Sequence, residues 1–193
     1  MHSADPLMDW SASVHQPFRF SPVPEDTFKT YYKHASEIQR WHEAFSPLRL
    51  SPDRVTQIFV TVLQAGYTGI RMVLNTVVAR SECYWDQFLP EFRAIISLCR
   101  TVFRILPQDV SFREQCGFSL DITIVPPLYI VCMFCRDPCI RRNALALLKR
   151  CPRREGVWDS GLTTDLATFL IEVEEEGMVD DCKLTKKLPK RHF

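Results

Sequence analysis

Four cysteines in the second half of the chain are the side chains best suited to metal chemistry: Cys132, Cys135, Cys139 and Cys151. The first two have the Cys-x-x-Cys spacing of a zinc half-site. Both lie in an apolar run, however, and the sequence has no second Cys-x-x-Cys pair and no histidine pair at zinc spacing. Because a free cysteine also packs as a small hydrophobic residue, we expect these cysteines in the core and predict no metal-binding residue.

Nucleophilic catalysis by a cysteine is a second possible chemistry, and it would need a histidine or a positive environment beside the thiol. None of the five histidines lies near a cysteine in sequence, so only folding could bring such a pair together. His34 and His42 are too far apart to chelate a metal from adjacent helical turns, and we expect them on a solvated helix face. Phosphate-binding glycine loops and a Gly-x-Ser-x-Gly elbow are absent from the sequence. We therefore predict no catalytic residue, no cofactor-binding residue and no enzyme.

Basic residues form three groups. The first is Arg141–Arg142, the second is Lys149–Arg150 with Arg153–Arg154, and the third is the lysines and arginine of the C-terminal tail. Such groups can bind nucleic acid or serve as nuclear-import signals. For the first two groups we favour solvated helix faces with local pairing to Asp137, Glu155 and Asp159. The tail is a candidate import signal. An acidic run, Glu172 with Glu174–Glu176, ends the last predicted helix, and pairing with the tail or with a partner stays open.

Elements of one type must position these side chains. Apolar residues recur at helical spacing and predict consecutive helices over about 26–45, 51–77, 86–106, 127–135, 137–149 and 158–176. Ser51 is the expected cap of the second helix, Asp137 of the fifth, and Asp159 or Ser160 of the sixth. Gly66 and Gly69 fall inside the second pattern and indicate close packing or a kink.

The periodicity also predicts which faces are buried. In the helix after Asp137, Ile140, Ala144, Leu147 and Leu148 face inward, while Arg141, Arg142 and Lys149 face outward. The second helix has the apolar positions Val55, Ile58, Phe59, Val62, Leu63, Ile70, Val73, Leu74 and Val77. The helix over 86–106 has Phe88, Phe92, Ile95, Cys99, Val102 and Phe103. The last helix is expected to bury Trp158, Leu162, Leu166, Phe169, Leu170 and Val173.

Composition places the chain among globular proteins. The 193 residues are 46% hydrophobic and 24% charged, which argues against disorder, and the net charge of +1 gives no global field for nucleic acid or anionic membranes. No apolar run is long enough to span a membrane, and no secretion signal precedes the cysteines, so we expect reduced thiols. The predicted fold is all-α, with consecutive antiparallel helices packed as an array or bundle. We expect a flexible arm over 1–25, a helical domain over 26–178 and a basic tail over 179–193.

An ordered set of residues between Ile124 and Ser160 resembles the C-terminal region of fungal zinc-cluster transcription factors. That set is Pro126, Pro127, Arg136, Pro138, Arg141, Arg142, Pro152, Arg153, Arg154, Glu155, Gly156, Trp158 and Asp159, and we refer to these positions as the signature residues. Weaker similarity extends the resemblance over about residues 28–177. We interpret the signature as structural: its arginines can hold carboxylates bidentately, Trp158 can pack under the preceding helix, and residues 152–159 would form a corner between two helices.

The resemblance implies a helical regulatory region of a nuclear protein, and nuclear localisation is expected, with the cytoplasm as the alternative. The binuclear zinc cluster of that family has six cysteines in the order Cys-x2-Cys-x6-Cys, repeated, and no segment here has it. The chain starts at Met1 with a short arm. We therefore expect no direct DNA binding by this chain, and no cofactor in it unless a zinc cluster precedes it. We expect it to act through protein partners or self-association. The alternative is a helical interaction module that acts through a partner without DNA contact.

Overall fold

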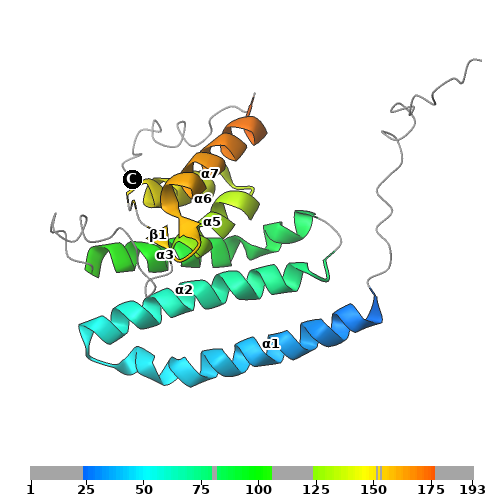
Figure 1. The fold of residues 1–193 in the computed structure, drawn as a ribbon, viewed down its shortest axis with the longest axis vertical. Coiled ribbons are helices and arrows are strands. Elements are labelled where there is room, and N and C mark those ends of the chain that lie inside the picture. Colours follow the sequence, from blue (N-terminus) through cyan, green and yellow to red (C-terminus); the bar gives the residue numbers. More distant parts are fainter. Residues whose placement is uncertain (1–23, 80–81, 106–123, 151, 153, 177–193) are drawn as a thin grey trace, which may run out of the picture.

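A long helical hairpin forms the first part of the fold. The computed structural model describes residues 24–79, 82–105, 124–150, 152 and 154–176. Helix α1 (Glu25–Phe45) and helix α2 (Arg54–Thr76) run antiparallel, and a short 3-10 helix, η1 (Ser46–Leu50), joins them (Figure 1). Phe45, Val60 and Tyr67 are the buried contacts between them. The predicted first helix is confirmed.

The cap of α2 differs from the prediction. Asp53 is the N-cap, because its carboxylate accepts both the backbone N–H and the hydroxyl of Thr56, each at 2.7 Å. These bonds hold the pKa of Asp53 below its usual value. Ser51 instead accepts the backbone N–H of Asp53. A carboxylate satisfies the exposed N–H groups of a helix start and also interacts favourably with the helix dipole.

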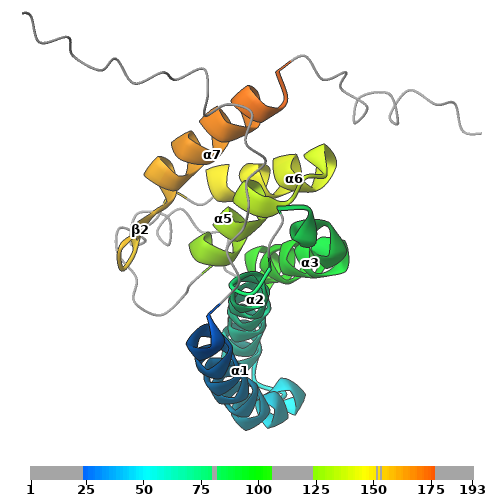
Figure 2. The same cartoon turned by 90° about the vertical axis from the view of Figure 1, so that its right-hand side faces the viewer.

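The hairpin packs against a third layer. A 3-10 helix, η2 (Glu82–Phe88), leads into helix α3 (Leu89–Ile105), which lies along α2 on the side opposite α1 (Figures 1 and 2). The predicted helix over 86–106 is thus divided at Leu89, and Pro90 occupies the first turn of α3, where its missing N–H costs little.

Three short helices and a small hairpin complete the described structure. They are α5 (Val125–Phe134), α6 (Pro138–Lys149), the two-residue strands β1 (Arg154–Glu155) and β2 (Trp158–Asp159), and α7 (Ser160–Glu174). Helix α5 packs on α2, α3, α6 and α7 (Figure 2). Its side chains are apolar on all sides, as a central helix requires. The all-α prediction is confirmed, and the strands are a small addition to it.

One hydrophobic core joins α2, α3, α5, α6 and α7. Its most buried members include Met72, Phe92, Ile95, Cys99, Val102, Val131, Cys132 and Ala144. The predicted stripe of α3 is confirmed, except that Phe103 is only partly buried. The inward face predicted for α6 is confirmed as well, because Ile140, Ala144, Leu147 and Leu148 are all buried.

The buried face predicted for α7 is wrong. Ser160, Thr163, Ala167 and Ile171 face the core, and small residues there let the helix approach α5 and α6 closely. Four of the residues expected inside are exposed instead: Leu162, Leu166, Phe169 and Val173, at 71, 43, 61 and 54%. Their spacing of four, three and four residues places them on one face, which we call the α7 outer face. Periodicity pointed to the face with the larger apolar side chains, whereas the buried face consists of smaller residues, two of them polar.

The apolar positions of α2 are divided in the same way. Val62 is buried, but Val55, Phe59, Ile70, Val73 and Val77 are exposed. Ala65 and Met72 of α2 belong to the core shared with α3 and α5, whereas Val60 and Tyr67 face α1. Because this helix is covered on two sides by different layers, its buried surface is broader than a single stripe and shifted from the one predicted.

The two glycines of α2 have different surroundings, and this difference gives a prediction. A Cβ at Gly69 would lie 3.0 Å from Ile130 Cδ1 and 3.8 Å from Pro127, so α2 and α5 meet closely there. Nothing lies within 4 Å of a Cβ at Gly66. We expect Gly66→Ala to raise the free energy of unfolding by about 0.5–1 kcal/mol through helix propensity. Gly69→Leu should lower it by about 1–3 kcal/mol through overpacking.

Urea unfolding of both variants, followed by circular dichroism, measures these changes. Gly66→Leu is the matched control for side-chain size. If Gly69→Leu were no less stable than Gly66→Leu, the close approach of α2 and α5 would be contradicted.

Candidate functional site

Glu155 is a buried carboxylate at the centre of the signature residues. It is 2% exposed, and its two carboxylate oxygens accept the backbone N–H groups of Ile124 (3.2 Å) and Val125 (2.9 Å). These N–H groups begin α5, where the helix itself supplies no acceptor. Pro126 and Pro127 occupy the following positions and have no N–H to satisfy. A side chain distant in sequence therefore caps α5.

A tight hairpin delivers Glu155 to that helix end. Strands β1 and β2 pair antiparallel, with Glu155 opposite Trp158 and Arg154 opposite Asp159. Gly156 lies in the turn at φ 57, a left-handed conformation that glycine adopts without steric cost. The corner predicted over 152–159 is thus a β-hairpin, which the sequence analysis did not anticipate.

Trp158 packs against the main core, to which α5 and α6 both contribute residues. Its ring lies 5.5 Å from that of Tyr129 in α5. The aromatic pair and the Glu155 cap fix the hairpin to the same helix from two positions.

The arginines of α6 pair with the acidic end of α7. Arg141 donates to Glu174 and, through Nε, to the carbonyl oxygen of Cys132 at 3.0 Å. Arg142 pairs with Glu175. The predicted outward orientation of Arg141 is wrong, since it is 3% exposed. These pairs account for Glu174 and Glu175 of the acidic run, and the tail that was considered as its partner lies outside the described residues.

The acids near these arginines serve as helix caps. Asp137 accepts the N–H of Ile140 at 3.0 Å and caps α6, as predicted. Asp159 accepts the N–H of Leu162 at 2.9 Å and caps α7, also as predicted. The suggested pairing of Arg141 and Arg142 with nearby acids is replaced by pairing across two helices.

The remaining signature residues lie at the edges of this arrangement. Arg136 pairs with Asp86 at 3.3 Å, and Pro138 begins α6. Arg154 donates to the carbonyl oxygen of Gly156, Pro152 is exposed, and Arg153 lies outside the described residues. The signature residues that the structure describes are thus positioned mainly by capping, pairing and packing.

Three of the described cysteines are core residues, whereas Cys83 and Cys139 are exposed, so the expectation that Cys139 lies in the core is wrong. Cys99, Cys132 and Cys135 are buried, and burial raises the pKa of the first two thiols to about 12 and of the third to about 11. A thiol of this kind stays protonated near neutral pH and is a poor nucleophile. Cys139 is disulfide-bonded, so the expectation of reduced thiols is wrong at this position. Among the described residues, no group of three or more potential ligands could hold a metal ion.

The two central histidines differ in environment. His34 is exposed and pairs with Glu37, as a solvated face predicts. His42 is partly buried, stacks on Tyr67 at 4.0 Å and lies 3.2 Å from the side-chain oxygen of Gln64. It therefore belongs to the contact between α1 and α2.

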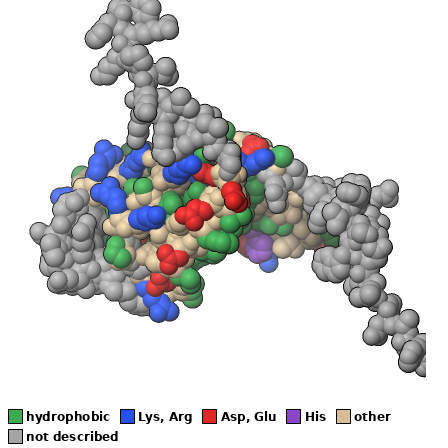
Figure 3. Space-filling model, turned by 90° about the horizontal axis from the view of Figure 1, so that it is seen from above, with side chains coloured by type: hydrophobic (Ala, Val, Ile, Leu, Met, Phe, Trp, Pro, Cys, Tyr) green, Lys and Arg blue, Asp and Glu red, His purple; other side chains and the backbone are tan. Residues whose placement is uncertain are grey.

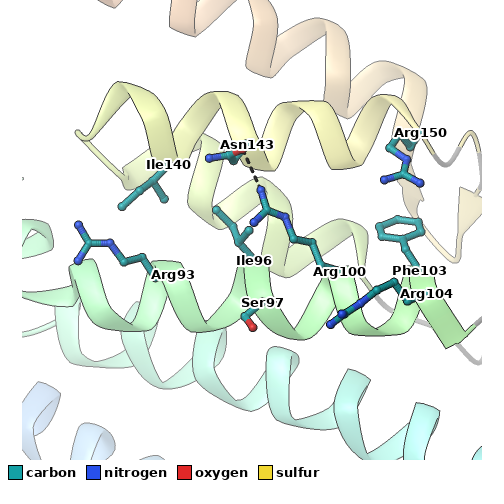
Figure 4. A pocket seen from close by; sticks show the side chains of 9 residues that line it. All are labelled: Arg93, Ile96, Ser97, Arg100, Phe103, Arg104, Ile140, Asn143 and Arg150. Carbon is teal, nitrogen blue, oxygen red and sulfur yellow. Dashed lines mark hydrogen bonds between the residues drawn. The ribbon is translucent and has the colours of Figure 1, made fainter. Parts of the chain in front are cut away.

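A basic groove lies between α3 and α6. Its volume is about 640 Å³. Four arginines line it (Arg93, Arg100, Arg104 and Arg150), together with the polar Ser97 and Asn143 and the apolar Ile96, Phe103 and Ile140. Figure 4 shows Arg93 near Ile140 at one end, Arg100 reaching toward Asn143, and Arg150 above Phe103 at the other end, where the Arg104 side chain points away from α6. We call it the arginine groove.

The described residues place no acid beside the charges of this groove. Among them no aspartate or glutamate lines it, and none of its four arginines has an ion pair. Arg100 donates to Asn143 Oδ1 at 2.9 Å, Arg104 to the hydroxyl of Thr101, and Arg150 lies 5.9 Å from the centre of the Phe103 ring. Guanidinium groups in such a hollow are suited to carboxylates or phosphates.

A second hollow makes the contrast clear. It has about 620 Å³ and is lined by Arg136, Arg141, Glu174 and Glu175 among others, so its arginines have acidic partners. Figure 3 shows basic side chains gathered over one part of the surface beside acidic ones. Only the arginine groove, of these two, offers cations without a carboxylate.

Arg93, Arg100 and Arg104 were not among the residues predicted to form a site. Their spacing of seven and four residues puts them on one helix face, and that signal was available. Their meeting with Arg150, however, depends on the packing of α3 against α6. Arg150 is exposed, as predicted for a solvated face, and it also lies at the end of the groove.

The Glu155 cap gives a sharp mutational prediction. In Glu155→Gln the side chain keeps its shape but has one acceptor oxygen in place of two. One of the two backbone N–H groups, of Ile124 or Val125, would then face the NH₂ group, which cannot accept a hydrogen bond. We expect the free energy of unfolding to fall by about 2–3 kcal/mol. The matched control is Asp159→Asn, where asparagine caps about as well as aspartate, and we expect a loss below about 0.5 kcal/mol. Equal losses in urea unfolding would contradict the role of Glu155.

The raised pKa values of the buried thiols lead us to expect that the free energy of unfolding falls at high pH. An unfolded cysteine has a pKa of 9.0, whereas the folded pKa values are about 12 for Cys99 and Cys132 and about 11 for Cys135. Below pH 9 these thiols are protonated in both states. Above it the unfolded state releases protons first, so stability falls as pH rises, by about 1 kcal/mol per thiol one unit above 9.

Urea unfolding near pH 8 and near pH 10, with a reductant present, measures this loss. The variant Cys99→Ala/Cys132→Ala separates these thiols from other groups that titrate in the same range. An unchanged pH dependence in that variant would show that the thiols do not contribute.

None of the described helices is long and apolar enough to cross a membrane. No family model matches the chain, and no solved structure matches it. Over 60 residues the chain is 44% identical to a curated protein of Emericella nidulans, the aspercryptin biosynthesis cluster-specific transcription regulator. The matched segment is 31% of this chain and 10% of that protein, so the chain corresponds to a small part of its relative's length. The chain is thus similar, over that segment, to a fungal transcription regulator.

Proposed function

We propose that the chain acts in transcription regulation, as the non-DNA-binding regulatory region of a fungal zinc-cluster-type transcription factor. The observation that carries the proposal is the 44% identity, over 60 residues, with a cluster-specific transcription regulator. The ordered signature residues also support it, because they resemble the C-terminal region of fungal zinc-cluster transcription factors. The region would function in the nucleus, and the helical domain would extend over residues 26–178.

Charge balance supports action without direct DNA contact. The chain has 24 basic and 23 acidic residues, so it has no overall field to attract a phosphate backbone. Any zinc would belong to a cluster elsewhere in the parent protein, and no cofactor is proposed for this region. No catalytic role is proposed either, since the signature residues are occupied with capping and packing.

Protein partners are the proposed means of action. The α7 outer face exposes four apolar side chains at helical spacing, and the arginine groove adds cations with no acidic neighbour. Exposed apolar surface of this kind often marks an interaction site. The same features support a second candidate function, a helical interaction module that pairs with a full-length regulator and has no regulatory output of its own.

A tethering experiment tests the proposal. The full chain is fused to a heterologous DNA-binding domain in a fungal strain with a matching reporter gene. We expect reporter transcription to rise or fall severalfold relative to the DNA-binding domain alone, because a regulatory region acts wherever it is brought to a promoter. The unfused chain should not shift duplex DNA in a mobility assay.

Two outcomes separate the candidates. A fusion that accumulates in the nucleus without changing the reporter would contradict the regulatory proposal, and co-purification of the chain with a full-length zinc-cluster regulator would then favour the interaction module. Binding of the unfused chain to duplex DNA would contradict the assignment as a non-DNA-binding region.

A further inference from the structure

The arginines of the groove form a row, and its length limits the ligand. Arg93, Arg100 and Arg104 lie on one face of α3 and span 11 residues, which is about 16 Å along the helix axis. Arg150 adds a fourth charge at the α6 side of the far end. A single phosphate or a small carboxylic acid would engage one end of such a row. An extended ligand with several negative charges is needed to engage all of it.

The floor of the groove distinguishes between extended anions. Ile96 and Ile140 are buried beneath the arginines, and Phe103 is partly buried with the Arg150 guanidinium 5.9 Å from the centre of its ring. A nucleic acid backbone has no apolar group to place on the two isoleucines, and the Phe103 ring, already contacted by Arg150, is a poor platform for base stacking. A peptide that alternates acidic and apolar side chains has groups for both the rim and the floor.

Helix geometry adds a reason for a helical peptide. Two helices that lie side by side have the same rise per residue. Carboxylates at positions i, i+7 and i+11 of a partner helix would therefore face Arg93, Arg100 and Arg104 in turn. Apolar residues one turn apart on the adjoining stripe would face the isoleucines. This is recognition of an amphipathic helix in a groove, with charge complementarity as its source of specificity.

We infer that the arginine groove binds an acidic amphipathic helix of a protein partner. The inference deepens the proposed function and rests on it for the partner's role in regulation, although binding itself can be tested alone. Arg100 would exchange its neutral acceptor, Asn143 Oδ1, for a carboxylate, and such a charge-assisted bond is stronger. Ser97 and Asn143 would supply hydrogen bonds along the rim.

The probe is a fluorescein-labelled helical peptide of about 16 residues, which spans about 24 Å. It carries glutamates at i, i+7 and i+11 and leucines on the adjoining stripe, and a control peptide has glutamine at each glutamate position. Fluorescence anisotropy with the full chain measures binding. We expect saturable binding of the acidic peptide, weakening as salt rises, and binding of the glutamine peptide weaker by about tenfold or more.

Two double variants locate the binding site. Arg93→Glu/Arg104→Glu should weaken binding of the acidic peptide by about tenfold or more. Arg40→Glu/Arg49→Glu makes the same charge change at exposed positions outside the groove and should leave binding within about twofold. Arg93→Gln/Arg104→Gln replaces the first variant if circular dichroism shows that charge reversal unfolds the chain.

Three results would overturn the inference: no saturable binding of the acidic peptide, equal loss in the groove and control variants, or stronger binding of a labelled DNA duplex than of the peptide. The tethered reporter separates this inference from the proposed function. If the fusion regulates the reporter but the peptide does not bind, the groove inference fails and the proposed function stands. If the peptide binds but the fusion is silent, the groove inference stands and the regulatory role fails.

Discussion

A single buried carboxylate organises the C-terminal half of the fold. Glu155 satisfies the first N–H groups of α5, and α5 is the helix against which α2, α3, α6 and α7 are assembled. Without this cap, the buried N–H groups at the start of α5 would have no hydrogen-bond acceptor. Each such unsatisfied donor lowers the free energy of unfolding. The carboxylate comes from the hairpin that follows α6. The N-terminus of α5 is therefore capped only after the chain has folded back and brought this hairpin to it.

Arginines have two distinct roles in this structure. Arg141 and Arg142 are neutralised by carboxylates of α7, and so they connect the last two helices. The arginines between α3 and α6 have only neutral partners in the described part of the chain. The net charge counts every arginine equally, whether or not a carboxylate lies beside it. A balanced total charge is therefore compatible with a local basic site.

Much of the fold could be predicted from the sequence because its signals are local. The Asp137-Pro138 start of α6, the Asp159 cap of α7 and the stripe around Phe92 and Ile95 depend on residues within a few turns. The α7 outer face could not be predicted, because the side of α7 that is buried has the smaller and partly polar residues. The burial of Arg141 could not be predicted either, because its partners, Cys132 and Glu174, come from other helices. The arginine groove could not be predicted because it forms only where α3 packs against α6. Arg100 and Asn143, which meet there, are 43 residues apart in the sequence.

The α7 outer face has a consequence for the behaviour of the isolated chain in solution. Colloidal stability depends on repulsion between molecules, and a net charge of +1 provides very little of it. Leu162, Leu166, Phe169 and Val173 meanwhile present contiguous apolar surface to water. The solubility of the separated domain is therefore set by this stripe, and one acidic substitution within it would improve solubility without disturbing the core.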